Sequence, residues 1–207
     1  MTNIKRIINK LLYPQIKQRG SNNSIEISDS AFLRKVRIKI YGSNNTITVK
    51  NNVYLHNVYI RIGFPDTPIN NCKIIIEENT GFNSGDIQLG ESNSSLTVGK
   101  NCMFSFGIEI TCTDTHSIFD MNGNLINKGE SIEIGSNVWV CKNAVIMKNS
   151  KIPDNCIVAQ NCIVTGKFYK ENCVLAGIPA KVVKENIYWK NLRPENFLKQ
   201  ESQITKL

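Results

Sequence analysis

The sequence feature that most constrains the fold is a six-residue repeat that begins at residue 134. Every sixth position is aliphatic, and the residue four positions after each of these is small in all but the last repeat. The aliphatic positions are Ile134, Val140, Ile146, Ile152, Val158 and Val164, and the positions that follow them are Val138, Ala144, Ser150, Cys156, Cys162 and Phe168. An α-helix repeats every 3.6 residues and a half-buried strand every two, so neither produces this pattern.

A period of six with one buried aliphatic residue per repeat predicts a prism with three flat faces. Each face takes one hexapeptide, about 18 residues complete a coil, and the coils stack like parallel strands about 4.8 Å apart. Residue i then lies beneath residue i+18, so we expect Val138 under Cys156 and Ala144 under Cys162. The cysteines at these positions are predicted to fill a narrow corner of the core.

The N-terminal half repeats more loosely. Segments that start at Gly20, Gly42 and Gly90 each join a polar turn rich in Asn and Ser to an alternating apolar strand. Asn and Gly tolerate left-handed backbone angles, which suits the sharp corners of such coils. The spacing is longer than in the C-terminal array, so we expect bulges or small loops here.

The repeats divide the chain into three parts. Residues 20–184 are predicted to form the β-helix domain, with an extruded loop near residues 115–131, where the six-residue rhythm stops. Residues 1–19 contain an amphipathic helical stripe. We interpret it as a cap on the first coil, with weak membrane-surface association as the alternative. Residues 185–207 are predicted to form a C-terminal cap or helix.

Composition narrows the partners and the compartment. A net charge of +8 favours an anionic partner, such as a phosphorylated cofactor or an acidic glycan. No recognition motif supports nucleic acid. There is no apolar run of the roughly 18 residues that a membrane span needs and no signal peptide, so a cytoplasmic location is expected. Seven cysteines without a Cys-x-x-Cys pair argue against a disulfide framework and against zinc.

Several stretches resemble a known family. The array from Ile132 to Val183, which ends in "VLAGIPAKVV", resembles the hexapeptide-repeat acyltransferases. The stretches "NCMFSFGIEI" and "TDTHSIFD" are similar to the branch that acetylates sugars and surface polysaccharides. The resemblance implies an all-β solenoid, a left-handed parallel β-helix, here with short helical extensions at both ends. It also implies a homotrimer that binds acetyl-CoA between neighbouring protomers and needs no metal.

His116 is the expected catalytic base. Acetyl transfer from a thioester to an alcohol requires the hydroxyl to lose its proton as it attacks, and a neutral imidazole can accept that proton at cellular pH. His116 lies in the loop that breaks the repeat, and the resemblance places a catalytic histidine there. The other histidine, His56, has no motif around it and is interpreted as structural or surface.

Two further residues are candidates for the catalytic centre. Asp114 is two residues before His116, where it could orient the imidazole, contact the acceptor or simply cap a turn. Trp139 matches the active-site tryptophan of the resembling enzymes. Its phase in the repeat points it outward, which suits stacking on a sugar or on the pantetheine arm, with burial at a trimer interface as the alternative.

The resemblance also assigns cofactor-binding positions in the last coils. These are Lys142, Ala159, Gln160, Thr165, Lys167, Gly177, Lys181 and Lys184. The last two match basic positions near the CoA phosphates, where lysine acts as a point charge. In "VTGKF" an extra residue precedes Lys167, which puts the reach of this lysine in doubt, and Lys142 is a weaker candidate.

The leading functional hypothesis is an acetyl-CoA-dependent O-acetyltransferase that acts on a sugar or a capsular polysaccharide. N-acetylation of an amino sugar is the alternative within the same family. A β-helix carbonic anhydrase would need three histidine ligands, and this chain has two histidines. A non-enzymatic β-helix scaffold is the third hypothesis, against which the His116 loop and "AGIPAK" argue.

Overall fold

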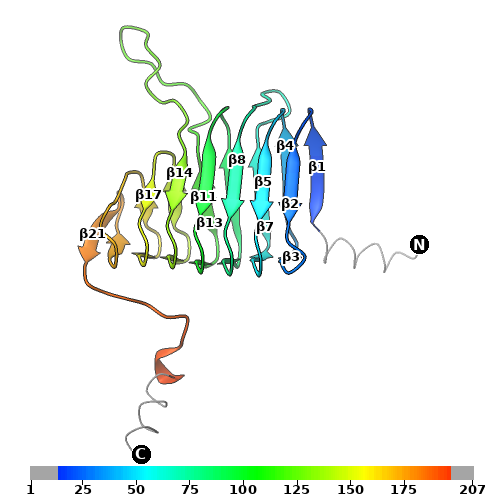
Figure 1. The fold of residues 1–207 in the computed structure, drawn as a ribbon. Helices are drawn as coiled ribbons and strands as arrows, with labels where there is room; N and C mark the ends of the chain where they lie inside the picture. The colour runs from blue at the N-terminus through cyan, green and yellow to red at the C-terminus, as the bar shows by residue number, and fades with distance from the viewer. Residues whose placement is uncertain (1–13, 197–207) are drawn as a thin grey trace, which may run out of the picture.

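The computed structural model describes residues 14–196, which form a three-sided parallel β-helix (Figure 1). The first face, sheet A, has seven strands: β1 (Gln15–Arg19), β4 (Arg37–Tyr41), β7 (Val58–Ile62), β10 (Gly85–Leu89), β13 (Ile108–Thr111), β16 (Val145–Met147) and β19 (Ile163–Val164). The second face, sheet B, has six: β2 (Ser24–Ile27), β5 (Thr46–Val49), β8 (Lys73–Ile76), β11 (Ser95–Val98), β14 (Ile132–Ile134) and β17 (Lys151–Ile152).

The third face, sheet C, has eight strands. They are β3 (Phe32–Arg34), β6 (Tyr54–His56), β9 (Gly81–Phe82), β12 (Met103–Phe104), β15 (Trp139–Val140), β18 (Ile157–Val158), β20 (Val174–Ala176) and β21 (Lys181–Lys184). Neighbouring strands are parallel on all three faces, except that β21 turns back antiparallel to β20 and ends the sheet.

The predicted stacking register is confirmed in the C-terminal coils as far as β19, and the last coil is shorter than predicted, because Ile157 pairs with Val174 and Lys151 with Lys167. Trp139 pairs with Ile157 and Val145 with Ile163, and each partner lies one predicted coil further along the chain. These pairings place Val138 beneath Cys156, whose carbonyl accepts the Trp139 N–H. The N-terminal coils are longer than the C-terminal ones, as expected, because Gln15 pairs with Arg37.

The core is a continuous column of aliphatic side chains. Ile38, Ile60, Ile87, Ile110 and Ile146 stack directly above one another in sheet A and are at most 1% exposed. Each adds roughly 1.5–3 kcal/mol by burial relative to exposure. On sheet C, Phe82 of β9 and Phe104 of β12 stack with their ring centroids 3.8 Å apart. The six-residue period is therefore the period of inward-facing side chains.

Asparagine occupies most of the corners. Fifteen Asn residues in the described chain have φ between 51° and 64°, the left-handed region that a tight corner requires. Their amides also join consecutive coils, for example Asn137 to Asn155 at 2.9 Å. The expectation that Asn forms the corners is confirmed, and the side chains add a hydrogen-bonded ladder along the edges.

The cysteines fill core positions. Six of the seven are buried and Cys141 is half-buried. Burial raises the pKa of the Cys112 thiol to about 12 and that of Cys102 to about 11, because the thiolate would lose its hydration. Thiols that stay protonated are poor nucleophiles and poor metal ligands, which agrees with the predicted structural role.

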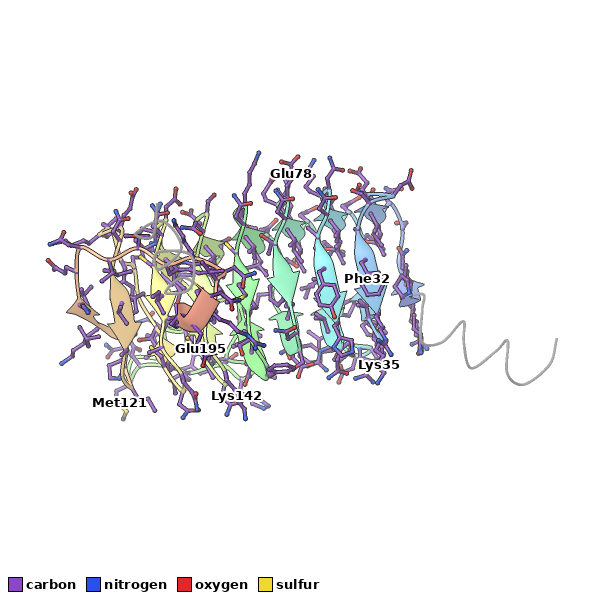
Figure 2. The ribbon with its side chains drawn as sticks, turned by 90° about the horizontal axis from the view of Figure 1, so that it is seen from below. Phe32, Lys35, Glu78, Met121, Lys142 and Glu195 are labelled. Carbon is purple, nitrogen blue, oxygen red and sulfur yellow. The ribbon has the colours of Figure 1, made fainter. Side chains whose placement is uncertain are left out.

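Two segments leave the prism. Residues 112–131 form a long loop that projects from the side of the β-helix, and residues 185–196 run away from β21 as an irregular segment (Figure 1). Phe32 and Lys35 lie toward the N-terminal end, while Met121 and Lys142 lie toward the C-terminal end (Figure 2).

The predicted terminal extensions are only partly covered by the structure. The helical stripe within residues 1–19 falls mostly on residues 1–13, outside the described part of the chain, and Gln15–Arg19 are strand β1. In the C-terminal segment, helix is confined to residues 194–196 among those described. Within residues 14–196 no helix has the length and apolarity to cross a membrane.

Candidate active site

The loop of residues 112–131 adds one coil's length of chain without adding a coil. Glu109 pairs with Val145, and Val145 pairs with Ile163 in the next coil. The chain between the first two residues is twice as long as the chain between the last two. The extra chain, equal in length to one C-terminal coil, is extruded between β13 and β14. The loop therefore stands on an uninterrupted stack, and the strands beneath it are a fixed platform for the residues that it carries.

Glu91 holds the two ends of this loop together. The Thr113 hydroxyl donates to Glu91 Oε1 at 3.2 Å, and the Gly129 N–H donates to Oε2 at 2.5 Å. A Cβ on Gly129 would lie 2.6 Å from the Glu91 carboxyl carbon and 2.9 Å from the Cys112 carbonyl oxygen, so a larger residue there would displace the Glu91 carboxylate or the backbone. One carboxylate thus closes the base of the loop.

A second set of contacts fixes the segment next to His116. Lys148 Nζ lies 2.7 Å from Asp114 Oδ2 and donates to the Asn127 carbonyl at 2.6 Å. The Asn127 side-chain amide donates to the same carboxylate oxygen at 2.9 Å. The Lys148 ammonium, followed by Asn127, holds the pKa of the Asp114 carboxyl below its usual value. The carboxylate therefore stays charged and bound to the loop at neutral pH.

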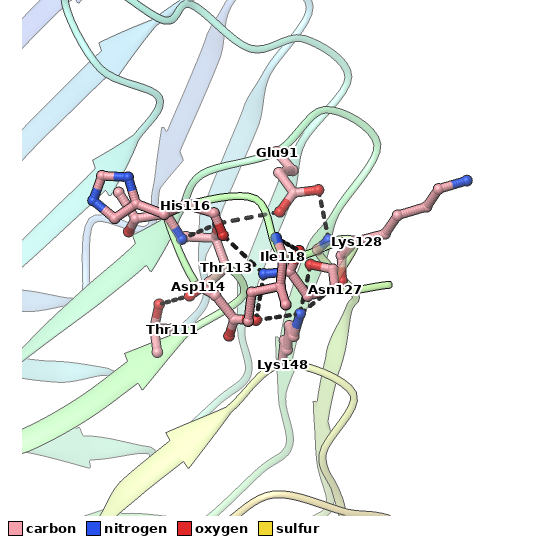
Figure 3. Close-up of polar contacts among 11 residues, drawn as sticks. Glu91, Thr111, Thr113, Asp114, His116, Ile118, Asn127, Lys128 and Lys148 are labelled. Carbon is pink, nitrogen blue, oxygen red and sulfur yellow. Dashed lines mark hydrogen bonds and ion pairs between the residues drawn. The ribbon is translucent and has the colours of Figure 1, made fainter. Parts of the chain in front are cut away.

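The backbone of His116 is fixed and its imidazole is exposed. The His116 N–H donates to the Asp114 carbonyl at 2.8 Å, and the Asn127 amide donates to the His116 carbonyl at 2.8 Å. Thr115, just before it, has a φ of 68°, which turns the chain sharply. The imidazole points away from the Asp114–Lys148 pair (Figure 3). The imidazole is therefore open to solvent on an anchored backbone.

The structure locates Asp114 and Trp139 differently relative to His116. In the described chain the Asp114 carboxylate contacts Lys148 and Asn127, while its backbone carbonyl contacts His116. Trp139 faces outward from β15 in sheet C, as its phase predicted, and its ring lies 5.9 Å from that of Trp189. His116 leaves the corner between sheets A and B, so one chain does not bring these two residues together.

The predicted cofactor residues fall into three groups. Lys142, Ala159, Gln160 and Gly177 lie at the corner between sheets C and A, where successive coils are joined by the hydrogen bond from Ile163 N–H to the Gly177 carbonyl (3.1 Å).

The other four lie elsewhere. Thr165 and Lys167 follow β19 at the corner between sheets A and B. The backbone of Lys167 forms an isolated parallel β-bridge with that of Lys151. Lys181 and Lys184 are the exposed ends of β21. The corner before Lys167 is shorter than the equivalent corner one coil earlier, because Ile146 pairs with Val164 but Lys151 pairs with Lys167. Lys167 therefore lies at the start of sheet B and not beside Gln160, which follows β18.

Sequence reasoning missed Glu91, Asn127 and Lys148. None belongs to a catalytic motif, and two of them are far from His116 along the chain. A signal did exist for Lys148: the stacked register places residue 148 above residue 112, where the loop begins. Predicting this position of Lys148 required knowing that the loop contains one coil's length of chain.

Comparison with known proteins agrees with this geometry. Residues 131–166 match the model of the bacterial transferase hexapeptide repeats. A polysialic acid O-acetyltransferase from Neisseria meningitidis is 38% identical over 121 residues, which cover 58% of this chain and 56% of that protein. The match thus spans little more than half the length of this curated relative.

Two solved structures match nearly the whole described fold. The polysialic acid O-acetyltransferase OatWY superposes with a TM-score of 0.77 at 27% identity, over 93% of this chain and 99% of that one. The polySia-specific acetyltransferase NeuO gives a TM-score of 0.71 at 23% identity, over 93% and 98% of the two chains. The chain thus carries the hexapeptide repeats of bacterial transferases, and polysialic acid O-acetyltransferases are among its relatives.

Proposed function

We propose that this protein is an O-acetyltransferase that moves the acetyl group of acetyl-CoA to a hydroxyl of a surface polysaccharide. The observation that carries the proposal is the His116 loop, an anchored backbone with an exposed imidazole on a rigid β-helix. The match of nearly the whole fold to OatWY supports the reaction and favours an acidic glycan as acceptor. Acetyl-CoA is made and used in the cytoplasm, so we place the reaction there.

His116 would act as general base. Its neutral imidazole takes the proton of the acceptor hydroxyl while the hydroxyl oxygen attacks the thioester carbonyl. The tetrahedral intermediate then collapses to the acetyl ester and expels the CoA thiolate, which takes the proton from the imidazolium. A base of this kind contributes roughly 10²- to 10⁴-fold to the rate.

Asp114 would position the base through the backbone, and its carboxylate would not act directly on the imidazole. Its carboxylate is occupied by Lys148 and Asn127, and those contacts fix the backbone on either side of His116. Positioning matters because small misplacements of a reacting group cost large factors in rate. Asp114, Lys148 and Asn127 thus form a support for His116.

The complete site would lie between protomers of a homotrimer. Trp139 on sheet C and the corner between sheets C and A, where Ala159 and Gln160 lie, are on other parts of the prism from His116. A neighbouring copy would therefore have to supply them. The loop also exposes apolar side chains, with Met121 fully exposed and Phe119 58% exposed. Such a patch is typical of an interface.

Acetyl-CoA would bind along the last coils of the β-helix. The backbone at Ala159, Gln160 and Gly177 would meet the pantetheine arm, and Lys181 and Lys184 would meet the phosphates. Lys142, Thr165 and Lys167 remain candidates for the rest of the cofactor, and Trp139 would stack on the arm or the sugar. N-acetylation of an amino sugar is the alternative reaction.

The test is acetyl transfer from labelled acetyl-CoA to polysialic acid, a neutral polysaccharide and an amino sugar. We expect label on the acidic glycan that mild alkali releases, because esters are labile and amides are stable under those conditions. Alkali-stable label on the amino sugar would select the alternative reaction. No transfer to any acceptor, together with no binding of acetyl-CoA, would contradict the proposal and favour a scaffold.

A further inference from the structure

The outer surface of sheet A carries a row of stacked cations. Lys17, Lys39 and Arg61 are in register on β1, β4 and β7, so their side chains stand side by side on one face. Like charges on adjacent strands repel and destabilise a sheet. In the described chain none of the three forms an ion pair with a carboxylate. We refer to these three residues as the cationic row.

Aromatic rings contact two members of the cationic row, Lys39 and Arg61, without neutralising their charge. The Tyr59 ring lies 4.8 Å from the Arg37 guanidinium, 5.4 Å from Lys39 Nζ and 5.9 Å from the Arg61 guanidinium. The Phe64 ring lies 4.4 Å from Arg61 on the loop that follows β7. Cation–π contacts order these two side chains without using up the N–H donors of the Lys39 ammonium.

Arg61 has an unused donor in this arrangement. One of its terminal nitrogens donates to Gln88 Oε1, but its Nε is buried and has no hydrogen-bond partner. A buried donor without a partner is costly, and guanidinium groups bind carboxylates through paired N–H donors. Because Nε is closed to solvent, a ligand carboxylate would meet the terminal N–H groups of this half-buried side chain that Gln88 leaves free.

The cationic row leads toward the His116 loop. The same register continues from Arg61 to Gln88 on β10 and to Thr111 at the end of β13, where the loop begins. At the spacing of stacked strands, Arg61 is about 10 Å and Lys17 about 19 Å from β13. Asp86 and Glu109 occupy the adjacent row on β10 and β13, so the positive charge is confined to the first three strands.

We propose that the cationic row binds carboxylates of an acidic linear polysaccharide, on sugars some distance from the hydroxyl that is acetylated. This inference rests on the proposed function and adds an extended acceptor track to it. A chain laid along sheet A would reach the loop with one sugar while the row holds others. Long acceptors would therefore bind more tightly than short ones.

The matched variants are Lys17→Gln/Lys39→Gln and Lys50→Gln/Lys73→Gln. Both doubles remove two positive charges, but Lys50 and Lys73 are exposed on and beside sheet B, away from the row. The probes are fluorescently labelled polysialic acid, a short oligomer of it and neutral dextran. Affinity is measured by anisotropy, with acetyl transfer, thermal unfolding and oligomeric state measured on the same samples.

For the sheet A double we expect about a tenfold loss of affinity for the long polymer. Its KM for that polymer should rise similarly, with little change for the short oligomer. The sheet B double should behave like the wild type. Equal affinity of both doubles for the long polymer would overturn the proposal, as would a change of oligomeric state in the sheet A double or equal binding of dextran.

The anisotropy measurement of polymer binding distinguishes this inference from the proposed reaction. Transfer to the short oligomer with no effect of the sheet A double on polymer binding would contradict the track and leave the enzyme intact. Salt-sensitive polymer binding lost in that double, without acetyl transfer by the wild type, would support the track and contradict the reaction.

Discussion

The coils of the β-helix and the loop of residues 112–131 are stabilised in opposite ways. In the coils, each rung repeats the contacts of the rung before it, with aliphatic residues inside and Asn at the corners. The loop repeats nothing and depends on a few individual contacts made by Glu91, Asp114 and Lys148. Stability is therefore spread over many equivalent positions, whereas the proposed chemistry depends on a few unique ones.

The largest expected effect comes from removing the loop. Deleting residues 113–130 removes one coil's length of chain and restores the coil length seen between β16 and β19. Ser131→Asn is included, because Asn149 holds a φ of 62° at the equivalent corner of the next coil. We expect no acetyl transfer and a free energy of unfolding within about 1–2 kcal/mol of wild type, the scale of a few polar contacts at the base of the loop.

Circular dichroism with denaturant titration and the transfer assay measure both results of the deletion. A deletion protein that unfolds, or one that still transfers acetyl groups, would remove the distinction between the coils and the loop.

A pair of phenylalanine substitutions tests the same comparison by stability. Phe104 is fully buried against Phe82, and Phe104→Ala should cost about 3–5 kcal/mol. Phe119 is 58% exposed on the loop, and Phe119→Ala should change the free energy of unfolding of the isolated chain by less than about 0.5 kcal/mol. If the two proteins have similar denaturation midpoints, the loop is part of the cooperative fold.

The support of His116 is tested by Lys148→Met, with Lys128→Met as its control. Lys148 binds the Asp114 carboxylate, whereas Lys128 is an exposed loop residue without a side-chain ion pair in the described chain. We expect kcat to fall about 10- to 100-fold in the first variant, because His116 loses its fixed backbone, and to change little in the second. Equal kcat values would show that Lys148 does not position the base.

The pH dependence of the loop is the smallest expected effect. Because the pKa of Asp114 is depressed in the folded chain, its ion pair contributes stability that is present above about pH 4 and is lost only as the pH falls through the depressed value. Hydrogen exchange of the loop amides, corrected for intrinsic rates, should therefore stay within about twofold between pH 7 and pH 5. Loosening already at pH 6 would identify a different anchor.

The two regions also differ in how far the sequence predicts them. The six-residue period specifies which residues face inward, and so it predicts the three faces and the position of Val138 beneath Cys156. It also identifies the loop as the place where the period stops, and His116 with it.

The anchors escaped prediction for a physical reason. Glu91 and Lys148 act across stacked coils, and their partners follow from the three-dimensional register rather than from sequence proximity. The contact of Trp139 with Trp189 depends on the irregular path of the C-terminal segment, which no repeat encodes. The separation of Trp139 from His116 likewise follows from the order of the faces around the coil.

The most direct test of the account compares acetyl transfer with acetyl-CoA affinity in His116→Ala. The account predicts a transfer rate reduced by at least about 100-fold, with a denaturation midpoint and an affinity for acetyl-CoA close to those of the wild type. Full transfer activity in this variant would contradict the assignment of His116 as the base and, with it, the functional role of the loop.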